Sequence, residues 1–283
     1  MGIVMGQNNY GKADIRLVKV FRDTNRHEIK DVHIAVAQTG DFDAVNVDGD
    51  NSGAMATDTM RNTVYALAKD GLTSSIEDFG IKLVRHFVEA APKATGIRIN
   101  MTEHPWNRIE VDGEPHDHSF VRGAGVRTAE VAGDGKEFSV EAGIDDLIVL
   151  KTAESGWADF HRDRFTSLPE TNDRIMATVV AAKWQYGNRT DLDFDAAWES
   201  VRKQILETFT DHFSPSVQNT LYLMGKAVLE KHSEVERIHF SLPNRHHILY
   251  DLDRFGMEND NEIFHADAEP YGLIEGWVER EDS

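Results

Sequence analysis

Two polar side chains interrupt a strand-like pattern near the end of the sequence. From residue 238 to residue 252 the even positions are largely apolar, except for Asn244 and His246. Successive side chains of a strand point to opposite faces, so the amide and the imidazole share the apolar face. Because an unpaired buried polar group costs about 1–3 kcal/mol, we expect both side chains to have a hydrogen-bond partner or a ligand.

Three residues in the first half could take part in chemistry, although each also has an ordinary structural role. Lys12 follows Tyr10-Gly11 at the head of a predicted strand, where a lysine is usually solvated. Thr57 and Asp58 lie where a helix is predicted to begin, and either could be its N-cap. The residue types alone leave both interpretations open.

The second half contains a similar set of candidates. Arg174 lies between an acidic residue and an apolar run, where a salt bridge is its usual role. Val217 and Gln218 fall at the start of a predicted helix, where the Gln218 side chain would ordinarily face water.

Familiar cofactor and nucleophile motifs are absent from the sequence. The chain contains no cysteine, which excludes disulfides, thiolate nucleophiles and cysteine-ligated metals. No glycine-rich dinucleotide or phosphate loop is present. His116 and His118 could hold a metal at i, i+2 on a strand, but a polar turn after Asp112-Gly113 explains them more simply. We favour the turn and expect no metal.

The net charge of the chain limits the kinds of partner that we expect it to bind. The 283 residues include 30 basic and 49 acidic side chains, giving a net charge of −19. Such a chain is a poor general ligand for nucleic acid or anionic membranes, so we expect neither as a partner. The sequence has no apolar run of about 18 residues, and its N-terminus lacks the pattern of a signal peptide.

The elements that must position these candidates follow the same order in each half: two strands, two helices and further strands. In the first half we expect strands over 13–22, 29–38, 97–101, 106–111, 118–131 and 144–152, and helices over 58–70 and 76–90. In the second half we expect an extended segment over 173–187, helices starting near 193 and 215, and strands over 235–242 and 246–252.

A short repeat supports duplication. Residues 62–69 and 219–226 share the pattern N-T-x-Y-x-x-x-K. Long alternating strands with paired helices indicate an α+β fold with antiparallel sheets. We therefore predict two units, residues 1–150 and 151–283, whose strands form one fused sheet.

The candidate residues also lie in segments that resemble one family. The chain is similar to urate oxidases (uricases) in YGKADIRLVKV (10–20), ATDTMRNTVYALAKD (56–70), HPWNRIEVDGEPHDHSF (104–120), DRFTSLPETNDRI (163–175), SPSVQNTLY (214–222), SLPNRHHI (241–248) and PYGLIE (270–275). The resemblance implies tandem tunnelling-fold units, with helices on one sheet face and sheets closing into a barrel in a homotetramer. It also implies oxidation of urate by O2 to 5-hydroxyisourate and hydrogen peroxide, with neither metal nor organic cofactor.

The resemblance implies a binding role for five positions. Arg174 and Gln218 match the pair that grips the planar, anionic purine, and the backbone N–H groups of Val217 and Asp58 match further ring contacts. Trp157 stands where familiar members carry the phenylalanine that stacks on the purine, and a tryptophan can also stack.

The remaining roles concern protons and O2. Lys12, Thr57 and His246 match the family's proton relay, Asn244 matches the amide that holds O2, and Ile274 matches an apolar wall of that pocket. In the family Lys12 and Thr57 come from one subunit and the other site residues from its neighbour, so each active site lies at a subunit interface.

Two alternatives stay open at this stage. One is another purine- or pterin-handling enzyme of the same fold, of the zinc-dependent cyclohydrolase type. The other is a purine-binding or scaffold protein without catalysis, against which the presence of the relay residues argues. The last four residues, Arg-Glu-Asp-Ser, differ from the peroxisomal Ser-Lys-Leu of eukaryotic members, so we expect a bacterial cytoplasmic enzyme.

Overall fold

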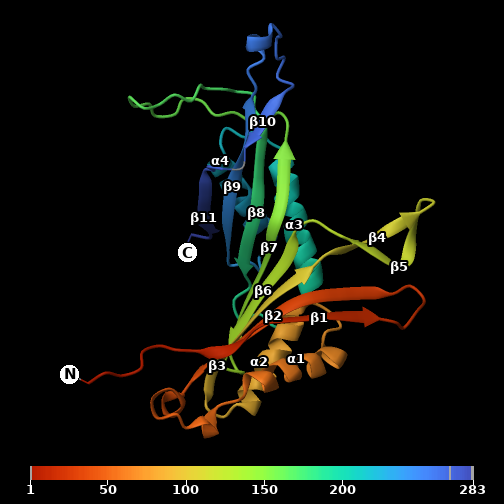
Figure 1. The fold of residues 1–283 in the computed structure, drawn as a ribbon, viewed down its shortest axis with the longest axis vertical. Helices are drawn as coiled ribbons and strands as arrows, with labels where there is room; N and C mark the ends of the chain where they lie inside the picture. Colours follow the sequence, from red (N-terminus) through yellow and green to blue (C-terminus); the bar gives the residue numbers. More distant parts are fainter. Residues whose placement is uncertain (1, 268, 282–283) are drawn as a thin grey trace. The chain divides into compact units, whose positions relative to one another are not determined.

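A computed structural model describes residues 2–267 and 269–281 of the chain (Figure 1). Its contacts define two compact units. The first contains the residues up to Gly143 together with Gln185–Trp198, and the second contains Ile144–Trp184 together with the residues from Glu199 onwards. The boundary placed at residue 150 from the sequence stays a prediction.

The first unit consists of antiparallel strands covered by two helices. Its hydrogen-bonded order is β1-β2-β3-β6-β7. The strands are β1 (Tyr10–Phe21), β2 (Glu28–Gly40), β3 (Ala94–His104), β6 (Val126–Gly133) and the start of β7 (Phe138–Lys151), which belongs to the second unit from Ile144 onwards. The helices are α1 (Thr57–Gly71) and α2 (Ile76–Ala90). Helix α1 packs on β1, and α2 packs on β3 and β6. The predicted β1–β2 hairpin and both predicted helices are confirmed.

Local sequence explains why α2 forms and which face it buries. The Ser75 hydroxyl accepts a hydrogen bond from Asp78 N at 3.0 Å, which satisfies one free N–H of the first turn. Phe79, Leu83 and Phe87 recur at i, i+4 and i+8, and all three are fully buried. The predicted apolar stripe therefore faces the sheet.

The strand predicted over 118–131 is two strands in the structure. Strand β5 (Glu114–Arg122) pairs with β4 (Trp106–Val111) in a separate two-stranded sheet, whereas β6 pairs with β3. The break lies at Gly123-Ala124-Gly125, where Gly125 has φ of +69°. A left-handed backbone ends strand geometry there, so the segment predicted as one strand belongs to two different sheets.

The second unit is also an antiparallel sheet with helices. Its strands run in the order β7-β8-β9, and β9 pairs with both β10 and β11. The elements are β8 (Met176–Gln185), α3 (Phe194–Thr210), α4 (Val217–Lys231), β9 (Arg237–Leu249), β10 (Phe264–Asp267) and β11 (Leu273–Glu279). Helix α3 belongs to the second unit only from Glu199 onwards. Helix α4 packs on β9 and β11. Short helical turns cover Ala44–Asp48, Asn51–Gly53 and Asp253–Phe255.

The two strands predicted over 235–242 and 246–252 are the single strand β9, which passes through Pro243 without a break. Pro243 pairs with Leu273, the first residue of β11. Proline has no backbone N–H to donate, so the lost hydrogen bond falls at the end of that ladder, where its loss destabilises the sheet least. Strands β10 and β11 were not predicted.

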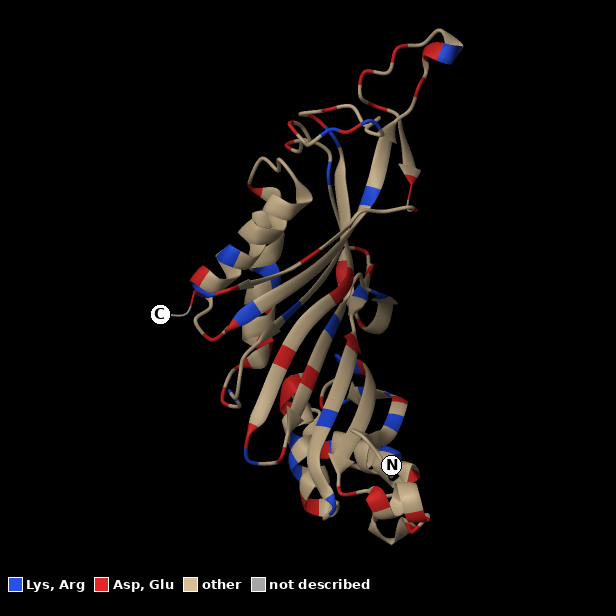
Figure 2. Cartoon of the chain, turned by 90° about the vertical axis from the view of Figure 1, so that its left-hand side faces the viewer, with Lys and Arg blue, Asp and Glu red and all other residues tan. Residues whose placement is uncertain are grey.

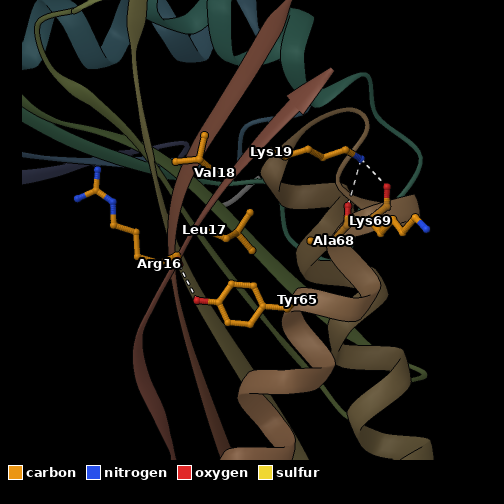
Figure 3. Close-up of a pocket in the computed structure, with 7 residues that line it drawn as sticks. All are labelled: Arg16, Leu17, Val18, Lys19, Tyr65, Ala68 and Lys69. Atoms are coloured by element: carbon orange, nitrogen blue, oxygen red, sulfur yellow. Dashed lines mark hydrogen bonds between the residues drawn. The ribbon is translucent and has the colours of Figure 1, made fainter. Parts of the chain in front are cut away.

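The edge of β1 meets α1 around a cavity of about 360 Å³ (Figure 3). Tyr65 donates its hydroxyl to Arg16 O at 2.8 Å, and Lys19 donates to the carbonyls of Ala68 and Lys69 at the end of α1 (Figure 3). None of the site residues predicted from the sequence lines this cavity, so its size does not make it the candidate site.

Charged residues of both signs are interspersed along the strands and helices of the described chain (Figure 2). Within the same residues, no helix combines the length and apolar character that a membrane crossing requires.

Candidate active site

Lys12 lies on β1 immediately before an irregularity in the strand. It is half buried and pairs with Val36, and the register shifts between Lys12 and Ile15. Asp14, inside the shift, has φ of +54°. The preceding residue must be glycine, because a Cβ on Gly11 would lie 1.8 Å from the Val36 carbonyl oxygen. The bulge re-aims the chain next to Lys12, which is a common device beside active sites.

Thr57 and Asp58 are the first two residues of α1. The N-cap is Ala56, which makes no side-chain capping bond, so neither residue takes the N-cap role that the sequence left open. The Asp58 carboxylate instead pairs with Arg61 at 2.6 Å. The first N–H groups of an α-helix have no partner within the helix, and here no cap side chain takes one.

A hydrogen bond ties these two segments of the first unit together. Met55 N donates to the Tyr10 hydroxyl at 2.9 Å. Tyr10 and Met55 each lie two residues before a predicted relay residue, Lys12 and Thr57. The Tyr10 ring is also held by Phe42, whose ring centroid lies 4.8 Å away. The structure therefore brings the strand start and the helix start into one neighbourhood.

Arg174, in the second unit, carries a partly buried cation that has no counterion among the described residues. Its Nε atom is buried and has no hydrogen-bond partner among the described residues. Burial lowers the pKa of Arg174, and no carboxylate of the described chain offsets it. The salt bridge that the sequence offered as an alternative is not formed among these residues. A buried donor of this kind is stabilised when an acceptor, preferably an anion, binds to it.

Backbone hydrogen bonds join Arg174 to the segment that carries Trp157. Arg174 N donates to Ser155 O at 3.0 Å, and Trp157 exchanges two backbone hydrogen bonds with Thr171, at 2.7 and 3.0 Å. The half-buried Trp157 ring lies parallel to that of Phe160, with 5.6 Å between the ring centroids. Backbone bonds of the same short loop thus position a planar aromatic surface and a guanidinium whose Nε has no partner among the described residues.

Val217 and Gln218 begin α4. The helix is capped by Ser216, whose hydroxyl accepts from Asn219 N at 3.0 Å. Val217 is buried, whereas the Gln218 side chain is exposed, so its amide is accessible to a ligand. The cap leaves the N–H of Val217 without an intrahelical partner.

Asn244 lies where β9 changes its pairing partner. Pairing with β11 extends to Pro243, and pairing with β10 starts at His246. Between them, Asn244 N donates to Gly272 O at 2.8 Å. Asn244 is 9% exposed and His246 is half buried, so both belong to the covered part of the strand, as the alternation predicts.

The apolar face of β9 is shorter than the alternation suggests. Leu242 is fully buried, but Ile248 is 56% exposed in the described chain. Ile274, the predicted wall residue, pairs with Leu242 across the β9–β11 ladder and is half buried. Asn244 and His246 therefore mark the end of the buried face.

His116 and His118 both lie on β5, because the turn is confined to Asp112-Gly113. The prediction that a polar turn contains them is therefore wrong. Their rings meet edge to face, with 4.5 Å between centroids. Among the described residues no group of three or more His, Asp or Glu side chains is arranged to hold a metal ion.

The sequence did not predict one set of polar residues near the proposed binding residues, of which Ser214 and Thr220 are buried and His212 is half buried. Ser214, Thr220 and His212 form a chain of hydrogen bonds next to the loop of Trp157. The only signal in the sequence was the Ser-Pro-Ser segment at 214–216.

Comparison with known proteins identifies the family. A model of the Uricase family matches residues 8–132 and 140–275. The uricase of Arthrobacter globiformis is 47% identical over 282 residues, which are 99% of this chain and 91% of that protein. The uricase of Dictyostelium discoideum is 40% identical over 280 residues, 98% of this chain and 97% of that protein.

The fold is shared as well as the sequence. The crystal structure of the A. globiformis uricase has a TM-score of 0.94, covering 100% of this chain and 97% of that chain. This likeness confirms the predicted fold class, α+β with tandem tunnelling-fold units of antiparallel sheet and helices. The resemblance found in the sequence segments is also confirmed, and the chain belongs to the uricase (urate oxidase) family of enzymes.

Proposed function

We propose that this protein oxidises urate, as a step of purine degradation, without metal or organic cofactor. Urate, O2 and water give 5-hydroxyisourate and hydrogen peroxide, so that two electrons pass from the purine to O2 and the water oxygen enters the product. Family membership supports the substrate and the reaction type. The observation that carries the proposal is Arg174, whose buried Nε has no partner among the described residues.

Urate fits the chemistry of the second-unit residues. It is planar and anionic, with carbonyl and N–H groups along its edges. The guanidinium of Arg174 and the amide of Gln218 can form paired, coplanar hydrogen bonds with such an edge. The Trp157 ring offers a face on which the purine stacks, and the N–H of Val217 adds a donor at the start of α4. A chain of net charge −19 must provide this positive site locally.

Proton transfer is assigned to Lys12, Thr57 and His246. Urate must lose protons before it can pass electrons to O2, and a threonine hydroxyl is a poor base on its own. Lys12 supplies the proton acceptor for Thr57, and His246 can pass a proton at neutral pH. Asn244 holds O2 or water above the ring, beside the apolar wall that Ile274 provides.

The active site is completed between subunits of a homotetramer. Lys12 and Thr57 come from one subunit, and the residues of the second unit come from its neighbour. Asp58 is bonded to Thr57 in the sequence, so its N–H must come from the same subunit as Thr57. An isolated monomer would then be inactive.

The test is urate consumption by the purified protein in air with a chelator present. Urate loss is followed by its ultraviolet absorbance, and hydrogen peroxide is measured in parallel. We expect matched loss of urate and release of peroxide, unchanged by the chelator. Urate that is bound but not consumed would indicate a binding protein, and urate that is neither bound nor consumed would refute the substrate.

A further inference from the structure

A buried chain of hydrogen bonds lies beside the residues assigned to urate binding. The Oγ of the fully buried Ser214 lies 2.7 Å from Thr220 Oγ1, which lies 2.9 Å from His212 Nε2. On the other side of the imidazole ring, His212 Nδ1 lies 2.6 Å from Thr208 O. All of these residues belong to the second unit, in α3, α4 and the loop between them.

The donors in this chain can be assigned from the chemistry. A carbonyl oxygen only accepts, so His212 Nδ1 carries the proton that is donated to Thr208 O. In the neutral ring Nε2 then accepts from the Thr220 hydroxyl. The oxygen of Thr220 is left to accept from Ser214, whose hydroxyl can alternatively turn to Ser216 O at 3.1 Å. The hydroxyl of Thr220 is the member that bonds to both Ser214 and His212.

The backbone of Ser214 holds the loop that carries Trp157. Ser214 N donates to Glu154 O, and Ser214 O accepts from Gly156 N, both at 2.8 Å. Arg174 N donates to the residue between them, Ser155. Three segments that contain predicted urate-binding residues therefore meet at this point. Thr220 lies on α4 two residues after Gln218, so its bond to Ser214 ties the helix start to the loop.

We propose that Thr220, with Ser214 and His212, is a positioning residue that fixes Trp157, Arg174 and Gln218 relative to one another and so sets the affinity for urate. The inference rests on the proposed function. These side chains act through the binding residues, and they carry no step of the reaction.

Two substitutions of Thr220 distinguish the effect of losing its hydroxyl from the effect of changing the side-chain volume. Thr220→Val keeps the shape but leaves Ser214 and His212 without their shared partner, whereas Thr220→Ser keeps the hydroxyl. We expect Thr220→Val to raise the dissociation constant of urate, measured without O2 to prevent turnover, by about tenfold, or about 1.4 kcal/mol. Its kcat should stay within about twofold of wild type, and Thr220→Ser should bind urate about as tightly as wild type.

Val228→Ala provides a matched control, because Val228 is fully buried on the same helix. It should lower the melting temperature without changing urate affinity. Equal urate affinity in Thr220→Val and wild type would overturn the proposal. An equal loss of urate affinity in Thr220→Val and Thr220→Ser would overturn it as well.

Amide hydrogen exchange at Gly156 and Arg174 adds a readout that does not need urate. Exchange should be faster in Thr220→Val than in the wild type and in Val228→Ala, and unchanged protection would refute the network. A wild type that does not bind urate would instead refute the proposed function.

Discussion

The buried carboxyl of Glu77 allows a stability prediction with a definite sign. Glu77 is fully buried at the start of α2 and pairs with Arg127 at 2.6 Å. Burial raises the pKa of Glu77 to about 7, although Arg127 opposes the shift. Arg127 also bonds to Asp195 at 2.5 Å, so it keeps a carboxylate partner when Glu77 is protonated. The neutral form of Glu77 is therefore compatible with the cluster.

The direction in which stability changes with pH follows from comparing the protonation of Glu77 in the folded and unfolded chains. Below pH 4.5 Glu77 is protonated in both states. Between pH 4.5 and 7 it ionises only in the unfolded chain, so its contribution to stability falls as the pH rises, and the loss is complete above pH 7. At about 1.4 kcal/mol for each pKa unit, the shift from 4.5 to about 7 amounts to about 3 kcal/mol.

The substitution Glu77→Gln isolates this contribution, because glutamine does not ionise. We expect the free energy of unfolding of Glu77→Gln, relative to wild type, to improve by about 3 kcal/mol from pH 4.5 to pH 8. Urea unfolding followed by tryptophan fluorescence, at one protein concentration, measures the difference at each pH. Glu207→Gln is the control, since Glu207 forms an exposed pair with Lys203. A difference for Glu77→Gln that does not change with pH would show that Glu77 is ionised throughout in the folded protein.

Three other predictions concern the site and the first unit. Lys12→Ala or Thr57→Ala should lower kcat by about 10²–10⁴-fold while size-exclusion chromatography shows an unchanged oligomer; normal turnover of urate by Lys12→Ala would refute the relay. Arg174→Lys should raise KM for urate by about tenfold, because an ammonium group cannot present two coplanar donors, and steady-state kinetics in which KM is unaltered would contradict the proposed grip. Asp31 accepts hydrogen bonds from Arg16 and from Trp106 of β4. The substitution Asp31→Asn should therefore lower the free energy of unfolding at neutral pH, measured in urea, by about 1–3 kcal/mol. Those bonds outweigh burial and lower the pKa of Asp31. The loss of stability in Asp31→Asn should therefore become smaller as the pH falls below the ordinary aspartate pKa, and a loss that does not change with pH would contradict the lowered pKa.

The elements predicted best are those whose signals are local. Helix α2 has a cap and an apolar stripe within one stretch of sequence, so its bounds follow from neighbouring residues alone. The break between β5 and β6 depends on which strands pair, β5 with β4 and β6 with β3, and the local sequence does not reveal that choice. Strand β10 is four residues long, too short for its alternation to stand out.

The site residues show a similar division. The alternation on β9 singled out Asn244 and His246 without any comparison, because a polar pair on an apolar face needs an explanation. Arg174 and Gln218 had ordinary interpretations, and only the family resemblance gave them roles. The bond between Ser214 and Thr220 joins a loop to a helix, and no spacing rule connects hydroxyls that meet only after folding.

The position of Asn244 has a physical basis in the pairing of β9. A strand that keeps the same neighbour on each of its two edges has its backbone N–H and C=O groups paired along its whole length. Strand β9 instead passes from β11 to β10 between Pro243 and His246. The change of partner opens the ladder at the point where the buried face ends, so polar side chains can be covered there without entering a continuous apolar core. The proline that marks the end of one ladder and the two polar residues that follow it are therefore parts of one arrangement.

An apolar side chain at position 244, as in Asn244→Leu, should leave the fold stable but abolish the reaction with O2, since the strand tolerates apolar groups and the proposed pocket needs the amide. Urate binding without O2 consumption, measured with an oxygen electrode, would support this assignment, and unimpaired O2 consumption by Asn244→Leu would refute it.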